Sequence, residues 1–143
     1  MNIVYNDTKK DLPVEQLYHL FLSVGWASKD IPSDDIDIPD DWLEKFNKPF
    51  INSTIVISAW DNDRLVGTVR AISDKFRRSV IYDMVVDPEY QGKGIGKELI
   101  KRCVAHNPKS QWLLETTEKN IDFYEKVGFK RSNSVFFSIE ANW

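Results

Sequence analysis

The chain contains the stretch Val85-Val86-Asp87-Pro88-Glu89-Tyr90-Gln91-Gly92-Lys93-Gly94-Ile95-Gly96-Lys97, which decides how its central part can fold. Before it, Ser79–Val86 is rich in strand-forming residues, and after it apolar residues recur at helical spacings. A glycine loop that leads into a helix presents unpaired N–H groups, and the helix dipole favours an anion beside them. Glycines also let the main chain approach a phosphate closely. The stretch therefore predicts a phosphate-binding site, with an ordinary glycine turn before a helix as the alternative.

The spacing of the glycines excludes two common phosphate loops. A P-loop needs Gly-x-x-x-x-Gly-Lys-Ser/Thr, which Gly92–Glu98 does not supply. A dinucleotide fingerprint needs Gly-x-Gly-x-x-Gly directly after a strand, whereas here the third glycine comes one residue early. What remains is Gln-x-x-Gly-x-Gly over Gln91–Gly96. Together with its flanks, Val-Asp-Pro-Glu-Tyr and Lys-Glu-Leu-Ile, this motif resembles the acyl-CoA loop of the GNAT N-acetyltransferase superfamily.

A second segment carries the same resemblance. Asn120-Ile121-Asp122-Phe123-Tyr124-Glu125-Lys126-Val127-Gly128-Phe129 indicates a short helix closed by a glycine. It is similar to the GNAT pattern Asn…Phe-Tyr-Glu-Lys-x-Gly-Phe. The resemblance implies that Tyr124 donates a proton to the departing CoA thiolate and that Asn120 contacts the pantetheine arm. The alternative is that Phe123 and Tyr124 are core aromatics of a short helix.

The resemblance implies acetyl-CoA as the co-substrate, with its pyrophosphate held by the glycine loop. It also implies a bulge that separates the strand before the loop from the next strand, so that pantetheine pairs with the freed backbone. An N–H of Val85 or Val86 would then face the acetyl oxygen, and such a donor is worth about 3 kcal/mol. The expected cofactor-binding residues are Met84, Val85, Val86, Gln91, Gly92, Lys93, Gly94, Ile95, Gly96, Lys97, Asn120, Phe123 and Lys126.

Acetyl transfer to an amine also needs a base, since a free alkylamine with a pKa of about 10 is mostly protonated at neutral pH. Asp83 is the first candidate, because it interrupts an apolar strand where desolvation would favour a proton acceptor. An ion pair with Arg70, or simple binding of the amine, is the alternative for Asp83. Glu115 and Glu118 are further candidates for the base. Tyr124 suits the proton donor, because a phenol stays protonated at neutral pH.

The acceptor pocket of GNAT enzymes is generally built from the first two helices, their connecting loop and the last strands. The resemblance places it here at residues 22–50 and 130–143. Trp26 and Trp42, together with Asp83, are the expected substrate-binding residues, and an acidic run nearby would attract an ammonium ion. Core packing of the tryptophans and ordinary solvation of the acidic residues are the alternatives.

A narrower resemblance runs from Val24-Gly25-Trp26 through Arg70-Ala71 to Asp83–Gly94. These residues look like the plant and bacterial GNAT branch that includes plastid serotonin N-acetyltransferases, some members of which also acetylate protein lysines. The resemblance implies acetyl transfer to a primary amine by direct attack, with an arylalkylamine as the expected acceptor. The chain departs from this branch in its 27–50 loop. A protein lysine or N-terminal acetyltransferase and a non-catalytic acyl-CoA-binding regulator remain open.

The order of the expected elements predicts one α+β domain over residues 1–143. We expect a mixed, mostly antiparallel sheet of six to seven strands with about four helices, and splayed strands at the acyl-CoA cleft. Strands are expected at residues 2–6, 54–60, 64–73, 79–86, 111–115, 129–131 and 134–140. Helices are expected at residues 14–24, 41–46 and 95–105, and around Tyr124.

Composition indicates the cellular setting. The single cysteine, Cys103, excludes a disulfide framework and favours a reducing compartment, so we expect a cytoplasmic protein. No apolar run approaches 18 residues, which argues against a membrane partner. The net charge of −3 argues against nucleic acid, and no cluster has metal-ligand spacing. The expected partner is a small-molecule or protein amine, and a homodimer is a further expectation.

Overall fold

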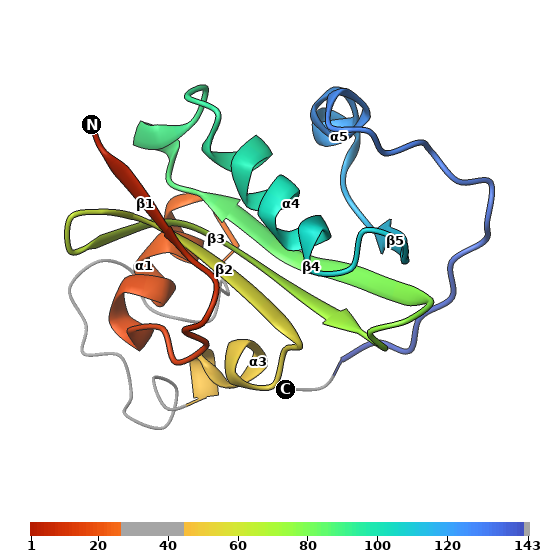
Figure 1. The fold of residues 1–143 in the computed structure, drawn as a ribbon, viewed down its shortest axis with the longest axis horizontal. Coiled ribbons are helices and arrows are strands. Elements are labelled where there is room, and N and C mark those ends of the chain that lie inside the picture. The colour runs from red at the N-terminus through yellow and green to blue at the C-terminus, as the bar shows by residue number, and fades with distance from the viewer. Residues whose placement is uncertain (27–44, 142–143) are drawn as a thin grey trace.

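The computed structural model describes residues 1–26 and 45–141 of the chain (Figure 1). The strands are β1 (Ile3–Asn6), β2 (Ile55–Asp61), β3 (Arg64–Ser73), β4 (Arg78–Val86) and β5 (Gln111–Leu114). The helices are α1 (Val14–Ser23), α3 (Lys48–Ile51), α4 (Ile95–Ala105) and α5 (Ile121–Lys126), with 3₁₀ turns η1 (Pro88–Tyr90) and η2 (Glu118–Asn120). The five strands and the helices α1, α4 and α5 each overlap an element that the sequence predicts. None of the helices in the described ranges is long and apolar enough to cross a membrane.

The strands form one mixed sheet in the order β1-β2-β3-β4-β5. Neighbours are antiparallel from β1 to β4, and β5 runs parallel to β4. A parallel pair needs a crossover connection, and here α4 supplies it. The chain therefore leaves β4, passes through the glycine loop and α4, and returns as β5 (Figure 1). This crossover places the glycine loop at the carboxyl end of β4.

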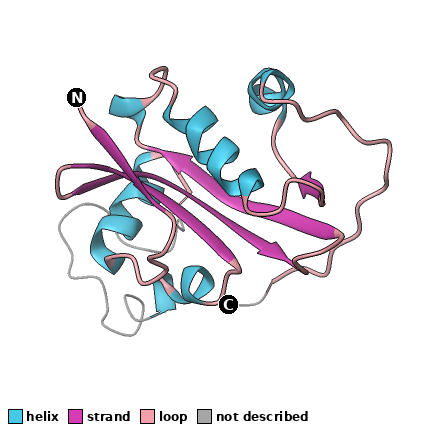
Figure 2. Ribbon diagram, in the orientation of Figure 1, coloured by secondary structure: helices cyan, strands magenta, loops and turns pink. Residues whose placement is uncertain are grey.

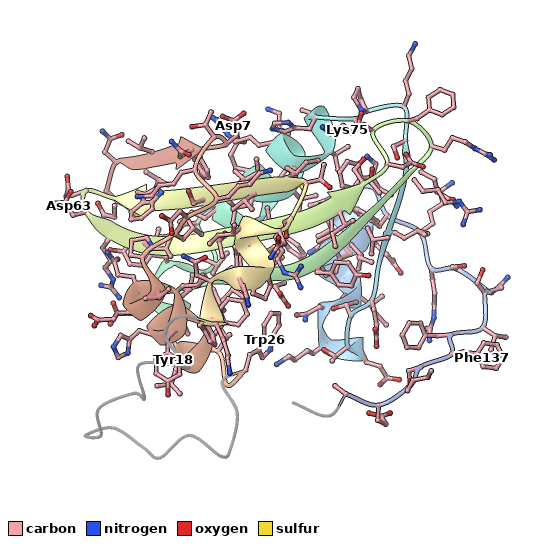
Figure 3. All side chains as sticks on the ribbon, turned by 90° about the horizontal axis from the view of Figure 1, so that it is seen from below. Asp7, Tyr18, Trp26, Asp63, Lys75 and Phe137 are labelled. Carbon is pink, nitrogen blue, oxygen red and sulfur yellow. The ribbon has the colours of Figure 1, made fainter. Side chains whose placement is uncertain are left out.

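Helices cover both faces of the sheet. On one face α4 buries the apolar residues whose spacing predicted it, and each fully buried side chain of this kind contributes roughly 1.5–3 kcal/mol. On the other face α1 and α3 pack against β2, β3 and β4, and Figure 3 shows both helices on the same side of the strands. The buried residues of α4 are Ile95, Leu99, Ile100 and Cys103. Those of α1 and α3 are Leu17, Tyr18, Leu20, Phe21 and Phe50.

The prediction of strands at residues 129–131 and 134–140 is wrong, and the described sheet has five strands, not six or seven. The residue that was expected to open the first of these strands instead closes α5. The Phe129 N–H donates to the Tyr124 carbonyl at 3.0 Å, and Gly128 lies in the left-handed region with a φ of +104°. From there the chain runs past β5 as a loop without pairing with it (Figure 2).

Part of the prediction falls where the structure gives no description. Residues 41–44 of the expected second helix lie outside the described residues, as does Trp42. The short helix α3 was not predicted; it begins beside Pro49 and buries Phe50. A helix of four residues is too short for its apolar residues to show a helical repeat in the sequence.

Candidate active site

The glycine loop and the first turn of α4 leave a row of backbone N–H groups without acceptors. Gly92 and Gly94 have φ angles of +76° and +84°, which L side chains rarely adopt. Among the described residues, no acceptor bonds the amides from Gly92 to Lys97, and the Glu98 N–H is the first to bond, to the Gly94 carbonyl at 3.1 Å. The helix dipole adds positive potential at the same end. The row therefore fits a pyrophosphate group.

The loop also leaves space for a ligand against its backbone. A Cβ added at Gly92 or Gly94 would meet no heavy atom within 4 Å. A Cβ at Gly96 would lie 3.2 Å from Cζ of Phe123 and 3.7 Å from Cε of Met84. The first two glycines thus keep the loop open, whereas Gly96 allows α4 to approach α5 and β4.

The side chains of the loop differ in their surroundings. The Gln91 side-chain amide donates to the Val86 carbonyl at 2.9 Å, which closes the loop onto the end of β4. Nζ of Lys93 lies 5.4 Å from the centre of the Tyr90 ring, and Lys97 is exposed. Gln91 therefore shapes the loop, while its predicted contact with the cofactor stays a prediction. The two lysines supply positive charge beside the amide row.

The sheet opens between β4 and β5 next to this loop. The two strands pair only over Arg78–Ile81 and Gln111–Leu114. Just beyond, the register of β4 against β3 shifts, so that Tyr82 and Asp83 together face the single residue Arg70. A bulge of this kind bends its strand and increases the local twist. Residues 82–86 consequently have no partner in β5, which is the separation that the resemblance implied.

The backbone of Met84, Val85 and Val86 lines this opening. On one side these residues pair with Val69, Thr68 and Gly67 of β3. Backbone groups of a strand alternate between its two neighbours, so the groups that do not bond β3 point toward the missing partner. The side chains of Met84 and Val86 pack on the α4 side, and that of Val85 on the α1 side. The strand predicted to bind pantetheine is therefore paired with β3 on one side and unpaired on the side of the opening.

Tyr124 of α5 packs over the core on the α4 side. Its ring meets the Phe123 ring at 5.0 Å and the Phe129 ring at 5.9 Å between centroids, both edge to face. Burial raises the pKa of Tyr124 above its usual 10.0, because desolvation disfavours the phenolate. Within the described residues its hydroxyl has no hydrogen-bond partner. The group is thus a neutral phenol with its proton available.

Asp83 lies at the bulge and is paired with Arg70. Its Oδ2 accepts from Nε of Arg70 at 2.6 Å, and its side chain is 34% exposed. Because Arg70 also lies over the ring of Phe50 in α3, this pair is on the face opposite Tyr124. The ion pair that was one alternative for Asp83 is therefore present, and its roles as base and as amine-binding residue stay predictions.

The remaining cofactor residues of the prediction come from the second motif. Asn120 precedes α5, and its side-chain amide lies 3.5 Å from Oγ1 of Thr117. Phe123 contacts the position of Gly96 on α4, so its packing role is established. Lys126 is exposed in the last turn of α5. The motif thus holds α5 against the loop that begins α4.

Trp26, one of the expected acceptor residues, lies on the side of the sheet that carries α1. Trp26 follows α1, is half exposed, and has its ring 5.8 Å from that of Phe21 (Figure 3). Glu115 and Glu118, the alternative bases, are exposed between β5 and α5. Across the described ranges, no group of three or more His, Cys, Asp or Glu side chains could hold a metal ion.

Sequence reasoning missed the residues that surround Arg70. Phe50, Ser53 and Tyr82 contact its guanidinium group. Their grouping depends on the bulge in β4, which is a property of strand pairing and leaves no mark in the spacing of apolar residues. The only local signal was Asp83, a charged residue in an apolar strand.

Comparisons with known proteins identify the family of the chain. The sequence profile of the acetyltransferase (GNAT) domain matches residues 52–131. The uncharacterized N-acetyltransferase ycf52 of Pyropia yezoensis is 30% identical over 133 residues, which cover 88% of this chain and 70% of that protein. The histone acetyltransferase TAP1 of Glycine max is 36% identical over 134 residues, covering 84% of this chain and 53% of that protein. A GNAT family structure from Streptococcus pneumoniae TIGR4 has a TM-score of 0.73 at 26% identity and covers 97% of this chain and 100% of its own.

The fold and the site define an acyltransferase, with an anion-binding loop beside a sheet that opens between two parallel strands. The chain belongs to the GNAT acetyltransferase family. Enzymes of this family use acetyl-CoA, and the open glycine loop, the unbonded amides and the two lysines fit its phosphate groups.

Proposed function

We propose that the protein transfers the acetyl group of acetyl-CoA to a primary amine by direct attack, and that the amine is an arylalkylamine. The observation that carries the proposal is the opening between β4 and β5. It has the amide row of the glycine loop at one end, Tyr124 on one face and Asp83 on the other. Acetyl-CoA supplies the acetyl group as an activated thioester.

Each side of the opening has a separate role. The amides from Gly92 to Lys97 hold the phosphate groups. Of the two N–H groups expected to face the acetyl oxygen, that of Val85 points toward Thr68 of β3, so the N–H of Val86 stabilises the developing oxyanion. Tyr124 gives its phenolic proton to the sulfur that leaves as the carbon–nitrogen bond forms and the carbon–sulfur bond breaks. The half-buried setting of Tyr124 supports this role, because it keeps the phenol protonated.

Asp83 receives the acceptor on the opposite face. Its partly exposed carboxylate would bind the amine as an ammonium ion or take its proton before attack. Trp26 is exposed on the side of the sheet that carries α1 and α3, where its ring offers a surface for an aromatic group (Figure 3). This combination of a carboxylate and an aromatic ring supports an arylalkylamine acceptor.

Thiol release from acetyl-CoA, measured with a panel of acceptors, tests the proposal. The panel contains tryptamine, serotonin, phenethylamine, polyamines, free amino acids and a lysine peptide. We expect turnover of the aromatic amines, and Asp83→Asn is expected to abolish their preference. If only polyamines or amino acids react, the arylalkylamine assignment is wrong while the acetyltransferase assignment stands.

A protein lysine acetyltransferase is the second candidate. It is favoured by the Glycine max relative, whose name describes a histone acetyltransferase. Turnover of the lysine peptide alone would support this candidate over the first. A third candidate, a non-catalytic acyl-CoA-binding regulator, would show a rise in melting temperature with acetyl-CoA and no thiol release with any acceptor.

We also propose that residues 1–143 act as one cytoplasmic domain that forms a homodimer. The buried free thiol of Cys103 supports a reducing compartment. Exposed apolar side chains in the segment 129–141 support self-association, because soluble monomers rarely expose such clusters. Sedimentation of the purified protein over a range of concentrations tests the dimer.

A further inference from the structure

The bulge in β4 gathers side chains that a regular strand would separate. Ile81 and Met84 both pack on the α4 side of the sheet. The two residues between them, Tyr82 and Asp83, both point away from that side. Consecutive side chains normally alternate between faces, and the extra residue of the bulge removes the alternation here. Both residues reach Arg70 of β3. Its Cζ lies 5.0 Å from the Tyr82 ring centre, and its Nε lies 2.6 Å from Oδ2 of Asp83.

Arg70 is itself held in place by its surroundings. Its guanidinium group lies over the ring of Phe50 at 5.9 Å as well as over that of Tyr82. Its Nη1 donates to Oγ of Ser53 at 3.4 Å, and Ser53 is buried. Only 16% of the Arg70 side chain is exposed, so few rotamers are open to it. Separation of the pair would leave the mostly buried charge of Arg70 without compensation, which is unfavourable. The ion pair therefore holds the Asp83 carboxylate in one position.

Asp83 uses only part of its hydrogen-bonding capacity in this pair. Oδ2 accepts from Arg70, whereas Oδ1 has no partner in the part of the chain that the structure describes. A carboxylate has about four lone-pair sites, so Oδ1 can accept from a further donor. The side chain is also partly exposed beside the opening of the sheet, where a ligand can reach it.

We infer that Arg70 is a positioning residue, which fixes Asp83 so that Oδ1 binds the ammonium group of the acceptor. The inference rests on the proposed amine acceptor. It states that the acceptor is selected by its positive charge, which Oδ1 of Asp83 recognises while Oδ2 accepts from Arg70. Without Arg70 the Asp83 side chain would turn freely into solvent, and a charged amine would lose its advantage over a neutral molecule of the same shape.

Binding of two matched probes tests this inference without turnover. Tryptamine carries an ammonium group, and tryptophol has a neutral hydroxyl group in its place. Their dissociation constants are measured by calorimetry on the full chain saturated with coenzyme A. We expect the wild-type protein to prefer tryptamine by roughly tenfold, the strength of one hydrogen bond between charged groups. In Arg70→Gln the preference is expected to fall to about one, while coenzyme A affinity stays unchanged.

The double variant distinguishes positioning from a merely structural role. If Arg70 acts only through Asp83, Arg70→Gln lowers the preference in the wild type and has no further effect in Asp83→Asn. Arg70→Lys is expected to restore part of the preference. Arg102→Gln is the control, because it removes an arginine ion pair of 2.8 Å with Glu98 on α4.

Three results would overturn the inference. They are a wild-type protein without preference, an Arg70→Gln variant that keeps it, and additive losses in the double variant. Thiol release is measured separately, so failure of the acceptor panel would count against the proposed function and leave this binding result intact.

Discussion

At the scale of single residues, Tyr124 is a half-buried phenol whose hydroxyl lacks a partner among the described residues. If this hydroxyl is the general acid, Tyr124→Phe removes one oxygen and lowers kcat by roughly 10²-fold. The ring contacts with Phe123 and Phe129 remain, so acetyl-CoA affinity and melting temperature are expected to stay close to those of the wild type. Steady-state kinetics and a thermal shift with acetyl-CoA provide the measurement.

The pH dependence of kcat gives a second readout of the same group. A general acid works in its protonated form, and burial raises the pKa of Tyr124 above 10.0. The rate should therefore lose the contribution of Tyr124 only as the pH rises through a value above 10.0. An alkaline fall in kcat at or below pH 10.0, absent from Tyr124→Phe, would mean that burial does not raise the pKa of Tyr124 as the structure describes.

At the scale of elements, the glycine loop before α4 combines an unusual backbone with open space. Gly94→Leu places a side chain at a φ of +84° on the side where no atom lies within 4 Å. The strain is expected to cost about 1–2 kcal/mol of stability, and the side chain would occupy the space left for a phosphate. We expect at least a tenfold loss of coenzyme A affinity by calorimetry.

Gly25→Leu is the matched control for this change. Gly25 has a φ of +79°, and a Cβ there also meets nothing within 4 Å, but it lies outside the glycine loop. Both variants should lose similar stability, and only Gly94→Leu should lose coenzyme A binding. Equal affinities in the two variants would remove the loop from the cofactor site.

Within α4, the buried thiol of Cys103 links stability to pH. Burial raises its pKa from 9.0 to about 12. Below pH 9.0 both the folded and the unfolded thiol are protonated, and above it only the unfolded thiol ionises. The free energy of unfolding should therefore fall by about 1 kcal/mol per pH unit above pH 9, up to the folded pKa. Urea unfolding of the wild type and Cys103→Ala at alkaline pH should give a steeper slope for the wild type.

The elements also show how far local sequence can predict this fold and site. The glycine loop and α4 were predicted closely, because glycine conformation and helical spacing are properties of neighbouring residues. The strands at 129–131 and 134–140 were predicted wrongly, because a strand needs a partner and Phe129 instead caps α5. The cluster around Arg70 was missed for the same reason, since the bulge arises from pairing between β3 and β4.

At the scale of the whole molecule, the sheet and its helices bury two apolar clusters of the described residues, whereas the segment after α5 contributes no buried residue to either. Residues 129–141 leave α5 and run past β5 as a loop (Figure 2). The exposed fractions of its large apolar side chains are 78% for Val135, 72% for Phe136, 88% for Phe137 and 99% for Ile139. Exposure of such a cluster to water is unfavourable by about 25 cal/mol per Å² of apolar surface, so a surface that covers it gains free energy.

We therefore predict that the protein associates with itself through this segment. Replacing Phe136 and Phe137 with serine should lower the sedimentation coefficient toward that of a monomer, because the apolar surface that drives association is reduced. The melting temperature of the monomer should change little, since neither side chain packs against the core. Phe76→Ser is the control, because Phe76 is 79% exposed in the hairpin between β3 and β4 and does not belong to residues 129–141. A double variant that sediments as the wild type does, or that unfolds at a much lower temperature, would show that these phenylalanines are covered within a single chain.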